Sequence, residues 1–255
     1  MTPALRVLEH NLVVYRRVWR GSMMVSFLAP ILFLAAMGIG LGGLVNRSSG
    51  GVGGAPYLLY LAPGLLAVNT MTTAAVESTY PIMAKVYWER TYEGMLATPL
   101  RAVDLLFGEA AWLTFRMAVV ATFFFVVMAL FGVVHGSEAL LAVPAAVLNG
   151  LAFALPILAF SATQRGDNGF SLLQRFLLLP LFMFGGAFFP IERLPALLQA
   201  LAWLTPLSHG VALTRGLTLG TLALPAAALH VTVLLLFIGA GLVAASITLR
   251  RRLVL

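Results

Sequence analysis

Long apolar stretches, separated by short polar segments, dominate the chain. A helix that crosses the hydrocarbon layer of a bilayer needs about 20 consecutive, mostly apolar residues. Six stretches of the chain meet this requirement. They run from Met23 to Leu44, Tyr57 to Thr79, Leu105 to Val134, Ala139 to Thr163, Phe170 to Phe189 and Leu224 to Leu249. The pattern therefore predicts an all-α integral membrane fold with six transmembrane helices.

The residues before the first stretch show a different pattern. Their large apolar side chains recur at steps of three and four, the spacing of one helical face. These are Leu5, Leu8, Leu12, Tyr15 and Trp19. Arginines interrupt the segment, so it lacks the continuous apolar core of a cleavable signal peptide. We predict an amphipathic helix over residues 1–21 that lies on the membrane surface. A charge cluster that only orients the protein is the alternative.

Composition narrows the functional classes. Of 255 residues, 61% are hydrophobic and 10% are charged, and the mean hydropathy is +0.98. These values exclude an ordinary soluble domain. Cysteine is absent, which removes disulfides, thiolate metal sites and cysteine nucleophiles. The net charge of +7 needs no nucleic-acid partner, because basic residues on the cytoplasmic loops of a membrane protein explain it equally well.

The distribution of basic residues predicts the orientation. With six spans, twelve of the 16 lysines and arginines fall on the side of the two termini. Arg47, Arg193 and Arg215 fall on the other side, and Arg116 lies within the third span. Since cytoplasmic loops carry the excess of Lys and Arg, both termini should be cytoplasmic.

A charged segment of the sequence "MAKVYWERTYEGMLATPLR" lies between the second and third spans. Pro81 precedes it, and Thr98 and Pro99 follow its helical part, so we expect one helix over residues 82–96 and another that begins with Thr98 as its cap. We expect its Tyr87, Trp88, Tyr92 and Met95 to be exposed among charges, a composition typical of protein interfaces. They are equally compatible with an aromatic belt at the lipid headgroups.

Two other segments exclude or leave open particular functions. The glycine-rich stretch from Asn46 to Pro56 is no phosphate-binding loop, since that motif needs a lysine followed by Ser or Thr. The only lysine is Lys85, and Val86 follows it. Three prolines interrupt residues 190–223, so this segment forms either an ordinary outer loop or a short hairpin that re-enters the membrane.

Three ionisable residues lie within or next to predicted spans, where such groups are functional candidates. Glu77, Glu109 and Arg116 are therefore candidates for a substrate path or a gate. Glu109 can instead extend toward the cytoplasmic surface, and Glu77 can pair with a loop arginine. His209 and His230 have no histidine or carboxylate neighbours at metal-ligand spacing, so we interpret both as structural and expect no metal site.

Several motifs, taken together, resemble a known family. The charged segment, continued as "YEGMLATPLRAVDLLFGEAAW", resembles the cytoplasmic loop of ABC-2 type transporter permeases, in particular the NodJ-type and daunorubicin-exporter-type subunits. "YLLYLAPGLLA" and "FGGAFFPIERLPALLQALAWLTPLSHGVALTRG" are similar to two further blocks of that family. The layout of six spans agrees as well, so the resemblance covers nearly the whole chain.

The resemblance carries specific expectations. In that family two six-span subunits pair around a translocation route, and each docks on a separate cytoplasmic ATPase through a coupling helix between spans two and three. It implies that residues 82–103 form this coupling loop. The implied docking contacts are Tyr87, Trp88, Glu89, Arg90, Glu93 and Met95. It also implies that residues 190–223 form a re-entrant outer hairpin.

We therefore expect residues 1–255 to form a single transmembrane domain of an ATP-driven exporter in the cytoplasmic membrane. Its substrate would be an amphipathic drug, lipid or lipid-linked saccharide. Two ATPase subunits would bind ATP and magnesium, and this chain would hold no cofactor and catalyse no covalent reaction. The second permease would be the same chain or a paralogue. The alternatives are an ion-driven secondary transporter, which needs carboxylates near the midplane, and a membrane enzyme, which needs a catalytic constellation.

Overall fold

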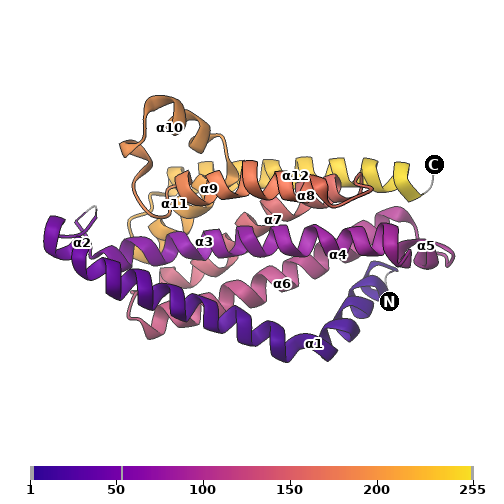
Figure 1. Ribbon diagram of the computed structural model, residues 1–255, viewed down its shortest axis with the longest axis horizontal. Coiled ribbons are helices and arrows are strands. Elements are labelled where there is room, and N and C mark those ends of the chain that lie inside the picture. Colours follow the sequence, from indigo (N-terminus) through magenta and orange to yellow (C-terminus); the bar gives the residue numbers. More distant parts are fainter. Residues whose placement is uncertain (1–2, 53, 254–255) are drawn as a thin grey trace.

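The computed structural model describes residues 3–52 and 54–253, which form an elongated bundle of helices (Figure 1). Apart from one isolated bridge between Val52 and Ala55, the described residues form helices, turns and loops. The all-α prediction is therefore confirmed. In chain order the elements are α1 (Pro3–Phe33), the π-helix η1 (Leu34–Leu41), α2 (Gly42–Ser49), α3 (Tyr57–Ser78), α4 (Tyr80–Met83), the π-helix η2 (Ala84–Trp88), α5 (Thr91–Leu96), α6 (Ala102–Leu130), the 3₁₀ helix η3 (Ser137–Leu141), α7 (Ala142–Ser161), α8 (Asn168–Leu172), the π-helix η4 (Leu173–Leu178), α9 (Leu179–Phe184), the 3₁₀ helix η5 (Ile191–Arg193), α10 (Ala196–Trp203), α11 (Pro206–Leu219) and α12 (Leu224–Leu253).

Five helical runs of the described chain are long and apolar enough to cross a membrane. They are Phe27–Ser48, Tyr57–Trp88, Ala102–Leu130, Ser137–Ser161 and Leu224–Leu253. A sixth candidate is the pair α10 and α11, which bends by 81° at its break. The protein therefore has five to six candidate spans, in agreement with the predicted membrane fold.

The fifth predicted span is shorter in the structure than in the sequence pattern. The apolar helix there runs from Asn168 to Phe184, which corresponds to about 25 Å at 1.5 Å per residue. The hydrocarbon layer is about 30 Å thick. The helix stops because Gly185 and Gly186 follow, and Gly186 has a positive φ of 84° that a side chain would disfavour.

The amphipathic segment predicted over residues 1–21 is not a separate helix. Its first two residues lie outside the described range, and the rest belong to α1, which continues directly into the first candidate span. The ribbon of α1 bends along its length (Figure 1). The predicted apolar face is also rotated, because Val7 and Asn11 are buried while Leu5, Leu12 and Trp19 are exposed. Val7 lies against Gly108 of α6, where a side chain on the glycine would overlap it.

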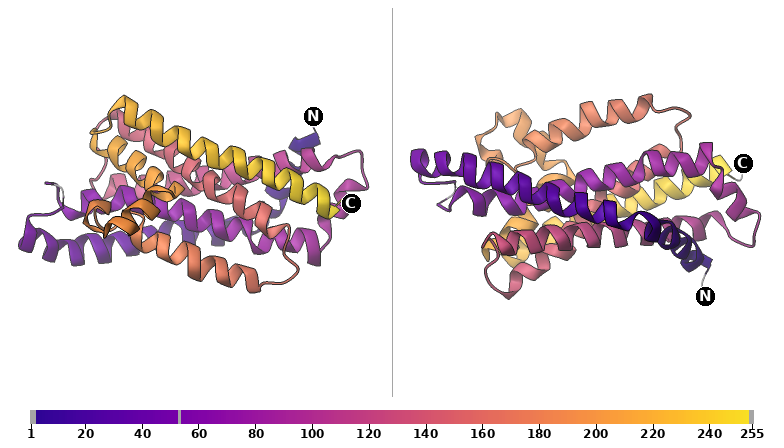
Figure 2. Two further views of the ribbon diagram at one scale, coloured as in Figure 1. Left: turned by 90° about the horizontal axis from the view of Figure 1, so that it is seen from above. Right: turned by 60° about the horizontal axis from the view of Figure 1, so that its bottom comes forward.

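The centre of the bundle is formed by α3, α7 and α11, which are largely buried. Buried polar side chains cross between them: Asn149 Nδ2 donates to the Ala67 carbonyl at 2.8 Å, and Thr214 Oγ1 donates to the Pro63 carbonyl at 2.8 Å. Such bonds satisfy polar groups that would otherwise be desolvated at a cost. The long helices α12 and α1 lie on opposite sides of this centre (Figure 1 and Figure 2).

The two ends of the bundle differ. The N-terminal part of α1, the C-terminal end of α12 and α5 lie together at one end, while α2 and α10 lie at the other (Figure 1). We call these the inner end and the outer end. The charged segment 82–103 therefore shares an end with both chain termini.

Candidate functional site

The predicted coupling helix is broken in the structure. A single helix over residues 82–96 is wrong, because η2 ends at Trp88 and α5 starts at Thr91. Between them Arg90 adopts the left-handed conformation with φ of 52°. This conformation costs a non-glycine residue about 1–2 kcal/mol. The segment is therefore a bent element of two short helices joined by a strained turn.

The start of the next helix also differs from the prediction. Thr98 does not cap it, because its hydroxyl donates to the Met95 carbonyl at 2.6 Å, at the end of α5. The helix α6 begins at Ala102, and the Asp104 carboxylate accepts a hydrogen bond from the Arg101 backbone N–H at 3.0 Å. The carboxylate satisfies a terminal amide and complements the helix dipole.

Five of the six predicted docking residues are exposed at the inner end. The exposed fraction is 45% for Tyr87 and 55% for Trp88, and three charged residues beside them are also exposed. These are Glu89, Arg90 and Glu93. Met95 differs, since it is half-buried and packs against the core of the chain itself. Exposed aromatic rings surrounded by charge have the composition of a contact surface.

Interactions among these exposed residues are weak. The Thr91 hydroxyl donates to Glu89 Oε2 at 3.3 Å, and Arg90 Nη1 lies 3.9 Å from Glu93 Oε2. Exposed ion pairs of this kind contribute about 0–1 kcal/mol. The Arg252 guanidinium lies 5.8 Å from the centre of the Tyr87 ring. The charges therefore remain available to another molecule.

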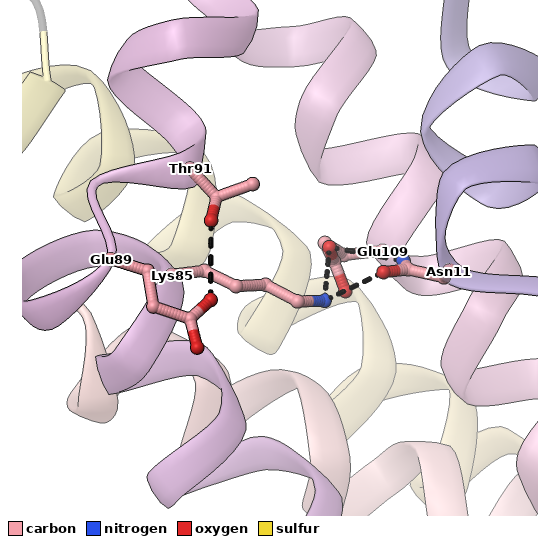
Figure 3. A network of polar contacts seen from close by, with 5 residues as sticks. All are labelled: Asn11, Lys85, Glu89, Thr91 and Glu109. Carbon is pink, nitrogen blue, oxygen red and sulfur yellow. Dashed lines mark hydrogen bonds and ion pairs between the residues drawn. The ribbon is translucent and has the colours of Figure 1, made fainter. Parts of the chain in front are cut away.

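A buried network lies directly beneath this surface (Figure 3). Lys85 Nζ of η2 lies 2.8 Å from Glu109 Oε1 of α6 and donates to Asn11 Oδ1 of α1 at 2.9 Å. Asn11 Nδ2 donates to Glu109 Oε1 at 3.1 Å. Glu109 is fully buried, so these contacts from η2 and α1 supply hydrogen-bond donors that water cannot supply there. The network joins three elements that are far apart in the sequence.

Tyr92 is fully buried beside this network, contrary to the expectation that it is exposed. Its ring centre lies 5.9 Å from Lys85 Nζ. Burial, followed by the nearby negative charge of Glu109, raises the pKa of Tyr92 well above its usual value. The phenol therefore stays protonated and anchors α5 to the bundle.

Arg116 and Glu77 form a second buried pair. Arg116 Nη2 lies 2.7 Å from Glu77 Oε1, and its Nε donates to the same oxygen at 2.8 Å. The guanidinium also lies over the ring of Tyr15, 4.8 Å from its centre. Glu109 and Arg116, which share a helix face, thus pair with different residues of the run from α3 to η2. Glu77 pairs with Arg116 of α6 and not with a loop arginine.

A groove between α3 and the rod formed by α8, η4 and α9 has a volume of about 300 Å³. Its walls are mostly apolar, and the polar groups in it come from Thr72, Thr79, Tyr80 and Gln174. The sequence did not identify this groove, because the two elements that line it are separated by nearly 90 residues of chain. Phe182 is a lining residue.

The two histidines are not isolated, contrary to the sequence interpretation. His209 Nδ1 lies 2.8 Å from His230 Nδ1, and His209 Nε2 lies 2.9 Å from the Trp203 carbonyl. Three or more His, Cys, Asp or Glu side chains do not gather as a metal-binding group anywhere in residues 3–52 and 54–253. The pair joins the bend between α10 and α11 to α12.

Arg215 of α11 forms what we call the arginine clamp at the outer end of the bundle, where its guanidinium contacts both α3 and the segment after α9. Arg215 Nη2 donates to the Gly186 carbonyl at 2.8 Å, and its Nε donates to the Tyr60 carbonyl at 3.0 Å. The guanidinium carbon lies 3.7 Å from the centre of the Tyr60 ring. The segment after α9 is thereby held against α3.

Comparisons with known proteins agree with this architecture. A family model described as "ABC-2 type transporter" matches residues 5–219. Nodulation protein J of Rhizobium leguminosarum bv. viciae is 31% identical over 98% of this chain and 94% of its own length. Nodulation protein J of Bradyrhizobium diazoefficiens is 34% identical over 97% of this chain and 92% of its own. The inner membrane transport permease YadH of Escherichia coli is 22% identical, over 76% and 74% of the two chains.

Proposed function

The chain belongs to the ABC-2 type transporter family and is a membrane permease, and we propose that it is the membrane-spanning subunit of an ATP-driven exporter. Docking on a separate ATPase subunit would occur through η2 and α5. The observation that carries this proposal is the exposed surface of Tyr87, Trp88, Glu89, Arg90 and Glu93, at the same end as both termini.

We assign ATP binding to a separate subunit because this sequence contains no phosphate-binding loop motif. The only lysine, Lys85, is followed by Val86 and is engaged with Glu109 and Asn11, so it does not resemble the lysine of a phosphate-binding loop. ATP and magnesium would therefore be bound by the partner ATPase, two copies per complex. This chain would act as a transport subunit without catalysing a reaction.

Coupling would use the second candidate span, in which α3, α4 and η2 follow one another with a break at Thr79. The helical run Tyr57–Trp88 extends from the outer half of the bundle to the docking surface. When ATP closes the ATPase dimer, the ATPase would displace Trp88. The helical run would carry this displacement into the bundle and so shift the populations of two permease conformations.

The substrate would be amphipathic: a drug, a lipid or a lipid-linked saccharide. The groove between α3 and the rod of α8, η4 and α9 supports this class. Its volume is about 300 Å³, and its apolar walls with a few polar groups suit a molecule of mixed polarity. A second permease, either this chain or a paralogue, would complete the route, and membrane lipid would cover the remaining exposed apolar faces.

The proposed location is the cytoplasmic membrane, with both termini in the cytoplasm. The excess of basic residues on the side of the termini supports this orientation. The expected re-entrant hairpin corresponds to α10 and α11, and their bend of 81° is compatible with it.

The ion-driven alternative is less well supported. Such a transporter needs a carboxylate that exchanges ions near the midplane. Glu77 and Glu109 are already paired with Arg116 and Lys85, respectively. A membrane enzyme would need a nucleophile with a positioned base, and the buried polar groups described above are joined instead in ion pairs and helix contacts.

The proposal is tested by co-expressing the tagged chain with the ABC ATPase subunits of its source organism and purifying the complex in detergent. We expect a stoichiometric complex that hydrolyses ATP. Trp88→Ala and Glu93→Gln should each lower the amount of ATPase subunit that co-purifies.

Matched controls come from the outer end, where Leu204 and Glu138 are also exposed. Leu204→Ala and Glu138→Gln should leave the complex intact. A chain that purifies alone and moves a solute in vesicles under an ion gradient without nucleotide would contradict the proposal and favour a secondary transporter.

A further inference from the structure

Two buried ion pairs connect α6 to the helical run from α3 to η2, and their polarities are opposite. In the pair nearer the inner end, η2 supplies the cation Lys85 and α6 supplies the anion Glu109. In the other pair, α3 supplies the anion Glu77 and α6 supplies the cation Arg116. Along α6, and along the run from α3 to η2, the two charges are therefore of opposite sign, and on α6 they are about two turns apart.

This arrangement fixes the register of the two helices. The pairing of Glu77 with Arg116 and of Lys85 with Glu109 shows that they run antiparallel. Sliding one helix along the other by two turns would place Lys85 beside Arg116, or Glu77 beside Glu109. Like charges at close range in a desolvated environment repel strongly, so the alternating charges favour one register.

The helix α1 takes part in both pairs through residues one turn apart. Asn11 bonds to both members of the inner pair, at 2.9 Å to Lys85 and 3.1 Å to Glu109. Tyr15 presents its ring to Arg116 at 4.8 Å, a geometry that attracts a cation. Three segments that are distant in sequence, α1, α6 and the run from α3 to η2, thus meet at the two ion pairs.

The pair of Arg116 and Glu77 is not fully satisfied. Arg116 Nη1 and the nearby Tyr15 Oη are buried and have no hydrogen-bond partner among the described residues. Native interiors leave few such groups, and those that remain require a specific reason. Unused polar groups at this ion pair are suited to a second pairing when the docking surface moves.

We propose that these two ion pairs, completed by Asn11 and Tyr15, form a register lock that makes η2, α1 and α6 move together when the ATPase partner changes state. This inference rests on the proposed function. Lys85, Glu109, Glu77 and Arg116 are positioning residues in this scheme, since they lie beneath the docking surface and act through it.

The experiment uses the absence of native cysteine. Leu204→Cys places one reactive thiol at the outer end, where the native side chain is 75% exposed. In the complex with the ATPase, maleimide labelling is measured without nucleotide and with ATP plus vanadate. We expect a several-fold difference between the two rates in the otherwise native chain.

The double variant Lys85→Met with Glu109→Leu removes both charges of the inner pair together. It should still assemble with the ATPase, but nucleotide should no longer change the labelling rate. The exchanged pair, Lys85→Glu with Glu109→Lys, should recover most of the response. A neutral pair that keeps the full response would overturn the register lock.

A matched control neutralises an ion pair at the same end whose cation is exposed. Arg101 is 82% exposed and pairs with Asp104 at 3.4 Å, and the double variant Arg101→Gln with Asp104→Asn should leave the nucleotide response unchanged. A loss of response in this control equal to that of the neutral inner pair would also contradict the lock.

If the double variants fail to fold, single changes at Lys85 retain the test, because this side chain is at the edge of the buried region. Lys85→Arg keeps a cation beside Glu109 and should preserve the response, whereas Lys85→Gln should abolish it. Equal behaviour of the two would overturn the inference. If the native complex does not form, or if nucleotide does not change the labelling rate of its cysteine, the result would instead contradict the exporter function itself.

Discussion

Glu77 on α3 and Arg116 on α6 are joined by two contacts of 2.7 and 2.8 Å to one carboxylate oxygen. Since Arg116 is buried, Glu77→Leu would leave its charge without a counterion. Loss of one partner of a buried pair costs about 3–5 kcal/mol. Thermal unfolding in detergent should therefore show a large fall in midpoint for this variant.

The double variant Glu77→Leu with Arg116→Leu should be more stable than Glu77→Leu alone, because no charge remains buried. Arg165→Leu, at an exposed arginine, is the control and should change stability little. Equal stability of Glu77→Leu and the double variant would mean that the unpaired charge of Arg116 costs no stability, which would contradict the prediction.

Two glycines of α12 predict opposite results for the same substitution. A Cβ on Gly241 would lie 2.6 Å from Pro156 Cδ of α7, whereas a Cβ on Gly239 would meet nothing within 4 Å. Gly241→Ala should therefore destabilise the protein by about 1–3 kcal/mol through overpacking. Gly239→Ala should be neutral or stabilising by up to about 1 kcal/mol, since alanine favours the helix. Unfolding midpoints measured side by side check the order of the two variants.

The contacts of Arg215 predict that this residue holds the segment after α9 against α3. Arg215→Lys replaces a planar group that reaches several carbonyls with a single ammonium, so the hold on Gly186 and Ala187 should weaken. Ala187 is fully buried, and a cysteine there should be protected from maleimide. Protection should fall at least tenfold when Arg215→Lys is added. Unchanged protection would show that the segment is held without the arginine.

The turn at Arg90 predicts a contrast between glycine and a β-branched residue. Because φ is 52°, Arg90→Gly should preserve or raise stability by up to about 1 kcal/mol, while Arg90→Val should lower it by about 1–2 kcal/mol. At Arg101, where the backbone is extended with φ of −101°, valine should be better tolerated than at Arg90. Equal costs of valine at the two positions would contradict the importance of backbone strain. Circular dichroism melts provide the comparison.

Some of the candidate site could be located from sequence and some could not. The charged segment between the second and third spans was identified because charge is rare in this chain, and the structure exposes five of its six named residues. Its helix boundaries were wrong at Arg90 and Thr98. Local propensity cannot reveal that a hydroxyl is used by the preceding helix or that one residue takes a left-handed turn.

The sequence alone could not identify which residues pair with the buried charges. Glu77, Glu109 and Arg116 stood out as ionisable residues in apolar surroundings, but their partners Lys85, Asn11 and Tyr15 lie between 24 and 101 residues away along the chain. Likewise, His209 and His230 have no histidine neighbour at metal-ligand spacing in the sequence, yet they meet in the structure across a separation of 21 residues. Each contact depends on how whole helices pack.

The sequence by itself determined the membrane class, nearly all of the candidate spans and the location of the charged inner loop. These features follow from local composition, because each span must satisfy the thickness and polarity of the bilayer on its own. Only the tertiary structure decided which buried charges neutralise one another, which face of α1 is covered and where the groove beside α3 lies. Those features depend on the register and rotation of packed helices, which are set by contacts summed over the whole bundle.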